Sequence, residues 1–130
     1  MNGWVLLAAA VAGGLGAGLR YLVDALVTAA VFTGPGKPTR FPVGILVVNA
    51  TGSLLLGVVT GLGAEVLGTD AAWILGVGLL GGYTTFSTVS LDSVLLARAG
   101  QSRRGWANAI ATLIVCVIAA AIGLTVGGIF

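Results

Sequence analysis

The chain has 130 residues, the length of one domain, and 58% of them are hydrophobic while only 8% are charged. Soluble domains are about a quarter charged, so this composition predicts an integral membrane protein. The lack of histidine excludes imidazole catalysis and histidine metal sites, and the single cysteine excludes an intrachain disulfide. With four carboxylates and a net charge of +2, we expect neither an enzyme nor a nucleic-acid-binding protein.

Four apolar segments are long enough to cross a bilayer, whose core requires about 20 helical residues. Together they predict an all-α, single four-helix membrane domain over residues 1–130. The segments are residues 4–32, 41–63, 71–97 and 106–130. The connections between them are short, and glycines and prolines in residues 33–40 break the helical pattern.

Polar residues inside the first two segments are candidates for function, because such residues are costly within a membrane. Arg20 ends the apolar part of the first segment, where it either extends to the membrane interface or forms an electropositive vestibule for anions. Asn49 lies about 12 Å along the second helix from Phe41, near mid-membrane, and Ser53 follows on the same helix face. The Asn49 amide either joins neighbouring helices or lines a functional site.

The third segment contains the densest polar cluster, since residues 81–88 read Gly-Gly-Tyr-Thr-Thr-Phe-Ser-Thr. Two glycines followed by β-branched and hydroxyl residues form a poor helix, so we expect an interruption at mid-membrane. Carbonyls freed there can hold a small cation, and freed N–H groups with hydroxyls can hold an anion. The alternative is a kinked helix whose hydroxyls bond to their own backbone.

Each segment also carries two glycines spaced four residues apart, a pattern that favours close helix packing or backbone exposed to a pore. The pairs are Gly14 and Gly18, Gly57 and Gly61, Gly78 and Gly82, and Gly123 and Gly127.

Three motifs resemble those of the Fluc/CrcB fluoride channels: GLGAGLRY at residues 14–21, VVNATGS at 47–53 and GGYTTFST at 81–88. The resemblance covers essentially the whole chain. It implies passive export of fluoride across the cell membrane, which lowers cytoplasmic fluoride toxicity. It also implies four transmembrane helices, a broken third helix and an antiparallel two-subunit assembly.

The same resemblance implies roles for particular residues. A structural sodium ion at the dimer centre would be held by the backbone carbonyls of Gly81 and Thr84. Asn49 would donate a hydrogen bond to fluoride, and Phe86 would present the positive edge of its ring. The other residues that we assign to the fluoride pathway are Thr85, Ser87, Thr88, Arg20, Ser53 and Thr112.

The sequence also departs from the family pattern at four positions. Val89 stands where the family has a second phenylalanine, and Asp92 stands where it has a glutamate. In the fourth segment, Thr112 and Cys116 align with a tyrosine and a serine. Val89 offers no aromatic edge to an anion, so the part of the pathway that would use this ring is altered.

The charges predict a single orientation in the membrane. The loops at 33–40 and 98–105 share one side, and all six positive residues are on or nearest to that side, so we expect these loops in the cytoplasm. A chain biased in this way predicts a second subunit inserted the other way, either a paralogous chain or, in the alternative, a second copy. The expected partners are this subunit, fluoride, sodium and membrane lipid.

Two other classes of protein share the four short segments. A small multidrug-type antiporter needs a carboxylate deep in its first segment, and the only candidate here is Asp24, beyond Arg20. A structural or holin-like protein would leave the polar run at residues 81–88 without a purpose. Both alternatives are therefore weaker than the channel.

Overall fold

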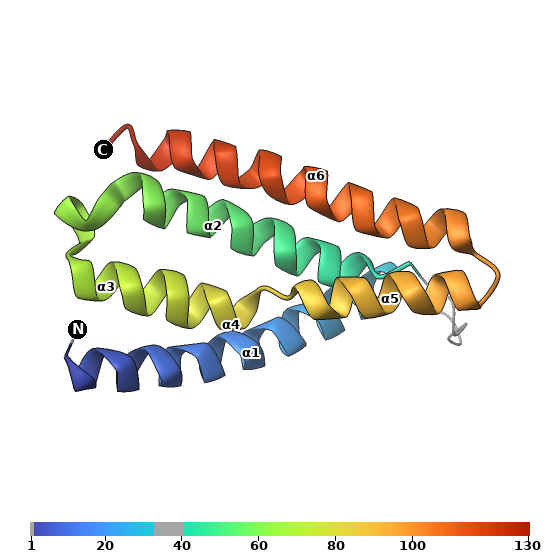
Figure 1. Ribbon diagram of the computed structural model, residues 1–130, viewed down its shortest axis with the longest axis horizontal. Coiled ribbons are helices and arrows are strands. Elements are labelled where there is room, and N and C mark those ends of the chain that lie inside the picture. Colours follow the sequence, from blue (N-terminus) through green and yellow to red (C-terminus); the bar gives the residue numbers. More distant parts are fainter. Residues whose placement is uncertain (1, 33–40) are drawn as a thin grey trace.

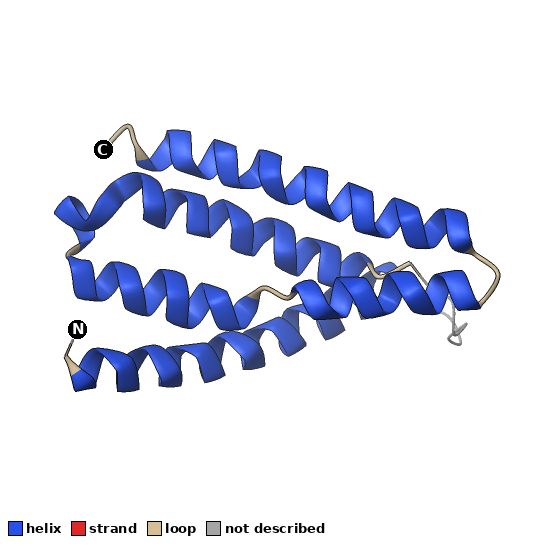
Figure 2. Ribbon diagram, viewed as in Figure 1, coloured by secondary structure: helices blue, strands red, loops and turns tan. Residues whose placement is uncertain are grey.

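The computed structural model describes residues 2–32 and 41–130. The predicted cytoplasmic loop at 33–40 lies outside these residues. Within them the chain is helical, with no strand (Figure 2). The elements are α1 (Gly3–Val31), α2 (Val43–Leu67), α3 (Thr69–Trp73), η1 (Ile74–Leu80, a π-helix), α4 (Gly81–Tyr83), α5 (Phe86–Arg98) and α6 (Ser102–Gly127).

These elements form four long rods, because α3, η1, α4 and α5 follow one another as the third (Figure 1). Both termini lie at the same end of the bundle as the connection from α2 to α3, and the connection from α5 to α6 lies at the other end (Figure 1). All four rods are long and apolar enough to cross a membrane. The predicted four-helix, all-α class is therefore confirmed, with the ends of the spans displaced by a few residues.

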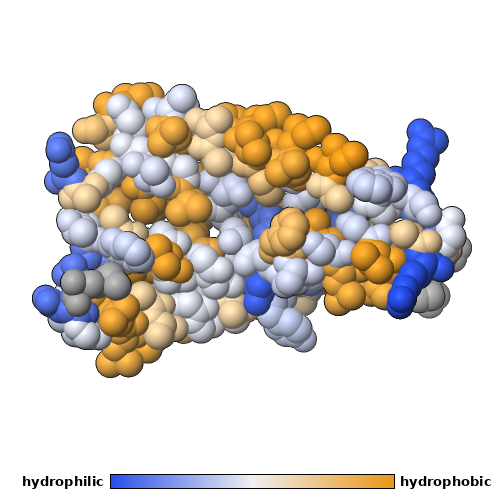
Figure 3. All heavy atoms as spheres, in the orientation of Figure 1, coloured by the Kyte–Doolittle hydropathy of each residue, from blue (hydrophilic) through white to orange (hydrophobic). Residues whose placement is uncertain are grey.

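The surface of the bundle is that of a membrane protein. Large apolar side chains are exposed along every rod, including Leu15 on α1, Leu55 on α2, Val77 on η1 and Leu113 on α6. On the face shown in Figure 3, strongly hydrophilic side chains gather mainly at the two ends, with a smaller group near the middle. Because water-facing apolar surface of this extent is unfavourable, the chain is a multi-pass membrane protein.

The helices α2 and α6 form the closest-packed pair in the bundle. Gly57 and Gly61 of α2 lie directly against the backbone of α6, and Gly123 and Gly127 of α6 lie against the backbone of α2. A Cβ atom at any of the four would collide with a backbone atom of the facing helix. The predicted packing role of these two pairs is confirmed, since only glycine permits this approach.

The first helix packs differently from the prediction. Gly14 and Gly18 have open space where a side chain would be, so they do not mediate packing within the chain. Instead, Gly16 contacts the backbone at Leu79. The predicted packing role of Gly78 and Gly82 is confirmed, because a Cβ at either would collide with the backbone of α1. The face of α1 that packs against the third rod therefore does not contain Gly14 and Gly18. Their four-residue spacing predicted a packing face, but spacing alone does not show which side of a helix contacts a neighbour.

Candidate functional site

The third rod is interrupted between α4 and α5. Thr84 has φ −79° and ψ 157°, and Thr85 has φ −150° and ψ 122°, so both are extended. In a continuous helix the N–H of Thr85 would donate to the carbonyl of Gly81. Here it donates instead to Oδ1 of Asn49 at 2.7 Å. The Gly81 carbonyl is thereby released from its helical partner.

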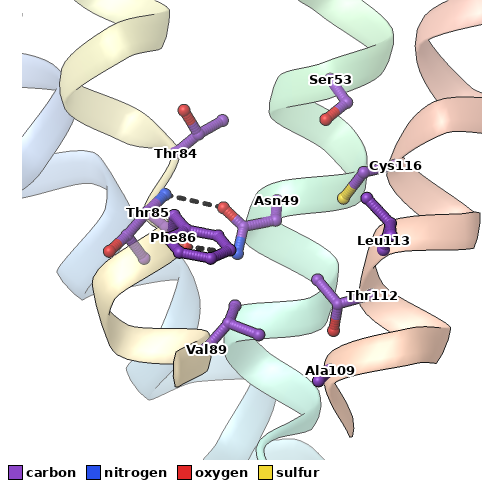
Figure 4. A pocket seen from close by; sticks show the side chains of 10 residues that line it. All are labelled: Asn49, Ser53, Thr84, Thr85, Phe86, Val89, Ala109, Thr112, Leu113 and Cys116. Carbon is purple, nitrogen blue, oxygen red and sulfur yellow. Dashed lines mark hydrogen bonds between the residues drawn. The ribbon is translucent and has the colours of Figure 1, made fainter. Parts of the chain in front are cut away.

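Asn49 holds this interruption with both ends of its amide. Besides accepting from Thr85, its Nδ2 donates to the Thr85 carbonyl at 2.9 Å (Figure 4). The Asn49 side chain is buried, 6% exposed, on α2. An extended segment within a membrane needs partners for its free backbone groups. Asn49 accepts from the free N–H of Thr85 and adds a second donor to the Thr85 carbonyl, which also begins α5 as the carbonyl of its N-cap residue. Of the two interpretations of Asn49 from the sequence, the bond to a neighbouring helix is present, and the functional role stays a prediction.

A cluster of hydroxyl groups starts the next helix. The Thr85 side chain accepts from the N–H of Thr88 at 3.2 Å and so caps α5. Its Oγ1 also lies 3.2 Å from the Ser87 hydroxyl and 3.0 Å from the Thr88 hydroxyl. This cluster places hydroxyl groups beside the positive N-terminal end of α5, an arrangement that favours negative charge.

A cavity of about 230 Å³ lies beside the interruption, between α2, α5 and α6. Figure 4 shows side chains from these three elements around it. Its ten lining residues are Asn49, Ser53, Thr84, Thr85, Phe86, Val89, Ala109, Thr112, Leu113 and Cys116. None of them is acidic, so the cavity lacks the carboxylate that a proton-coupled antiporter requires. Its polar groups are an amide, hydroxyls and a thiol.

Thr112 is the most unusual residue of this lining. It is 6% exposed, and within the described part of the chain its Oγ1 is the one buried side-chain oxygen or nitrogen without a hydrogen-bond partner. Leaving a buried hydroxyl unpaired costs about 1–3 kcal/mol, so such groups call for an explanation. Cys116, one turn further along α6, is half-buried beside the same cavity.

Arg20 and Phe86 have different surroundings from the rest. The Arg20 side chain extends from α1 to the interruption, where its Nη1 donates to the Thr84 carbonyl at 3.5 Å, the long limit for a hydrogen bond. It does not line the cavity. Phe86 does line it, yet 86% of its surface is exposed. In this single chain the phenyl ring therefore lies mostly outside the bundle.

The structure thus brings together most of the predicted site. Asn49, Ser53, Thr85, Phe86 and Thr112 share the cavity. The remaining three pathway residues, Arg20, Ser87 and Thr88, contact the interrupted segment but not the cavity.

The sequence analysis missed Asn108, which is 1% exposed between α5 and α6. The signal that could have found it is the same as for Asn49, an amide within an apolar span.

The fold and the site together define a four-helix membrane protein whose interrupted third span borders a cavity lined by apolar side chains and a few polar groups. Residues 7–124 match the family model described as CrcB-like protein, Camphor Resistance (CrcB), and the chain belongs to this family.

Three similar proteins, all named as fluoride-specific ion channels, extend along nearly the whole chain. FluC 1 of Leifsonia xyli is 40% identical, over 99% of this chain and 90% of its own length. FluC 1 of Symbiobacterium thermophilum is 41% identical, over 95% of this chain and 96% of its own. FluC of Shewanella halifaxensis is 38% identical, over 91% of both chains.

Proposed function

We propose that this chain is a subunit of a fluoride-selective channel that lets fluoride leave the cell passively and so limits its toxicity. The observation that carries the proposal is the Asn49 amide, buried at the interrupted third span beside a cavity of uncharged donors. The family and its relatives named as fluoride channels identify the ion. A channel needs no chemical step, so the relevant chemistry is the replacement of the water that surrounds fluoride.

The residues of the cavity are suited to that replacement. An asparagine amide has two N–H donors, and the Thr85 carbonyl uses one, which leaves the other for an anion. The unpartnered hydroxyl of Thr112 is a second donor, and it lies on the α6 wall. The positive N-terminus of α5 adds a field that favours negative charge. Arg20 contributes a fixed positive charge at the same interruption.

We propose that backbone carbonyls of the interrupted segment hold a sodium ion. Hard cations prefer oxygen ligands, and the Gly81 carbonyl is free of its helical partner. The Thr84 carbonyl belongs to the same extended segment, where it accepts one long bond from Arg20 and retains a lone pair. These two carbonyls would hold the ion, which supplies fixed positive charge to the channel interior when bound. Two oxygens are few for such an ion, so a second subunit would provide the rest.

An inverted second subunit accounts for polar surface that a single chain leaves uncovered. Gly81 and Thr51 are exposed near the middle of their spans, and the Thr51 hydroxyl lies 3.0 Å from that of Tyr83. Polar groups at this depth are unfavourable toward lipid, so we expect a second subunit to cover them. We propose an antiparallel pair, formed with a paralogous chain or with a second copy, in the cell membrane. The cytoplasmic placement of residues 98–105 follows from their positive charge.

The decisive experiment is fluoride efflux from liposomes, followed with a fluoride electrode. The purified chain is reconstituted alone, and then with a neighbouring paralogue where one is encoded. We expect fluoride efflux without a proton gradient, and chloride efflux at least a hundredfold slower. Efflux that requires a proton gradient and a cation would instead establish the antiporter. A chain that releases neither ion in either preparation would overturn the proposal.

A further inference from the structure

Asn108 forms a second buried amide contact, separate from that of Asn49. It lies on α6 and is 1% exposed. Its Nδ2 donates to the Val89 carbonyl at 3.3 Å and to the Ser93 hydroxyl at 3.0 Å, both on α5. The Ser93 hydroxyl in turn donates to the same Val89 carbonyl at 2.7 Å. Three polar groups of two helices are therefore joined in one buried network.

This network lies directly beside the cavity, although neither Asn108 nor Ser93 belongs to its lining. Val89, whose carbonyl accepts from Asn108, forms part of the α5 wall, and Thr112, one helical turn after Asn108, forms part of the α6 wall. On the other side of Asn108, Gly105 lies so close to α5 that a Cβ there would be 2.5 Å from the Ser93 carbonyl oxygen. Asn108 thus connects α6 to α5 directly beside the cavity.

We propose that Asn108 is a positioning residue that fixes the separation of the two cavity walls and thereby the selectivity for fluoride; this inference rests on the proposed function. Both N–H groups of its amide are already donated, so it does not bind the anion itself. The residue acts through α5, and specifically through Val89 and the helix that begins at Phe86.

The need for such a residue follows from the interruption. A continuous helix would transmit its orientation from α4 to α5, but Thr84 and Thr85 are extended, so α5 is oriented by contacts to its neighbours. Asn49 of α2 holds the start of α5, and Asn108 of α6 holds the side of α5 that faces α6. A wider gap would admit a larger anion or one that keeps its water, and discrimination between fluoride and chloride would fall.

The test compares Asn108→Leu, which replaces the amide by an apolar side chain of similar size, with Thr125→Ala as a matched control. Thr125 is also on α6, but its hydroxyl is exposed and bonds only to its own helix. We expect Asn108→Leu to lower the ratio of fluoride to chloride efflux about tenfold, as the loss of buried hydrogen bonds would. Thr125→Ala should leave the ratio within twofold. Size-exclusion chromatography establishes that each variant assembles.

A second measurement does not depend on transport. Cys116 is the only cysteine and lies on the cavity wall, so its rate of modification by a small methanethiosulfonate reagent reports the geometry of the cavity. We expect this rate to change at least fivefold in Asn108→Leu and in Asn108→Asp, and to stay unchanged in Thr125→Ala. If the wild-type chain carried no fluoride but the labelling rate changed as expected, the proposed function would fail while the positioning role stood.

Three results would overturn the inference. The first is an unchanged efflux ratio and labelling rate in an assembled Asn108→Leu channel. The second concerns the case in which Asn108→Leu does not assemble. Asn108→Asp keeps the shape of the side chain, and an assembled Asn108→Asp channel with the wild-type efflux ratio and labelling rate would contradict the inference. A lower total efflux at the wild-type ratio would likewise contradict it, because that pattern indicates fewer folded channels rather than a changed cavity.

Discussion

Two of the contacts made by α2 differ in kind, although both bury the same helix. Toward α6, α2 presents glycines, and the helices approach until their backbones touch. Toward the third rod, α2 presents Asn49, which replaces the helical acceptor that the N–H of Thr85 lacks and also donates to its carbonyl. Regular helices pair their backbone N–H and C=O groups internally, so the contact between α2 and α6 requires only complementary surfaces. The interrupted segment exposes backbone groups, so the second needs hydrogen bonds from elsewhere.

This difference indicates where chemistry can be located in an apolar bundle. The glycine seam between α2 and α6 can stabilise the fold, but it offers nothing to an ion. The interruption offers carbonyls, N–H groups and the end of a helix, and it lies next to the cavity. The side chains that stabilise the interruption are therefore the same ones that we propose for the anion pathway.

Replacing Asn49 by alanine should have the largest effect on the interrupted region. The change removes two buried hydrogen bonds, each worth about 1–2 kcal/mol, and also the donor that we assign to fluoride. We expect fluoride efflux to fall at least a hundredfold. Thr60→Ala, on the same helix but exposed and bonded only to Leu56, should retain wild-type efflux. Near-normal efflux in Asn49→Ala would remove Asn49 from the pathway.

The glycine seam can be tested by Gly57→Val, which should affect stability more than transport chemistry. A side chain there collides with the backbone of α6 at Ala120 and Leu124. Overpacking of this kind costs about 1–3 kcal/mol, so we expect the free energy of unfolding to fall by about 2 kcal/mol. The matched control is Gly14→Ala, where a Cβ meets open space. If both variants unfolded alike in a denaturant titration, the close approach of α2 and α6 would be wrong.

Thr85→Val should have a moderate effect, because it keeps the backbone bonds to Asn49 and removes the cap of α5 together with the contacts to the hydroxyls of Ser87 and Thr88. Loss of a helix cap costs about 1 kcal/mol. We therefore expect a fall of about that size in the free energy of unfolding and a roughly tenfold loss of fluoride efflux. Ser90→Ala removes a hydroxyl that bonds to Phe86 within the same helix and serves as control. Equal behaviour of the two variants would contradict a special role for the cap.

Thr112→Val should change the free energy of unfolding least among these variants, while still lowering fluoride efflux. The hydroxyl has no partner, so removing it should leave the free energy of unfolding unchanged or raise it by about 1 kcal/mol. If this hydroxyl donates to the passing anion, fluoride efflux should nevertheless fall about threefold to tenfold. A variant that loses stability but not efflux would show that the hydroxyl serves the fold, and would place it outside the pathway.

Much of this protein could be predicted from its sequence, because the membrane imposes strong and local requirements. Span length and apolar composition determined the four helices, and the Gly-Gly and Thr-Thr sequences in residues 81–88 determined where helix formation is weakest. Asn49 and Arg20 were identifiable because polar residues inside an apolar span are rare. The motifs also indicated the family, to which the chain belongs.

Tertiary structure decided which groups meet, because contact depends on helix rotation and pairing rather than on spacing along the chain. It selected Gly16 rather than Gly14 as a packing residue of α1, and it directed the Asn49 amide to the backbone of Thr85. It also placed Asn108 between α5 and α6, a residue to which the sequence analysis gave no role. A sequence shows where a polar group is costly; only the packed helices show which partner satisfies it.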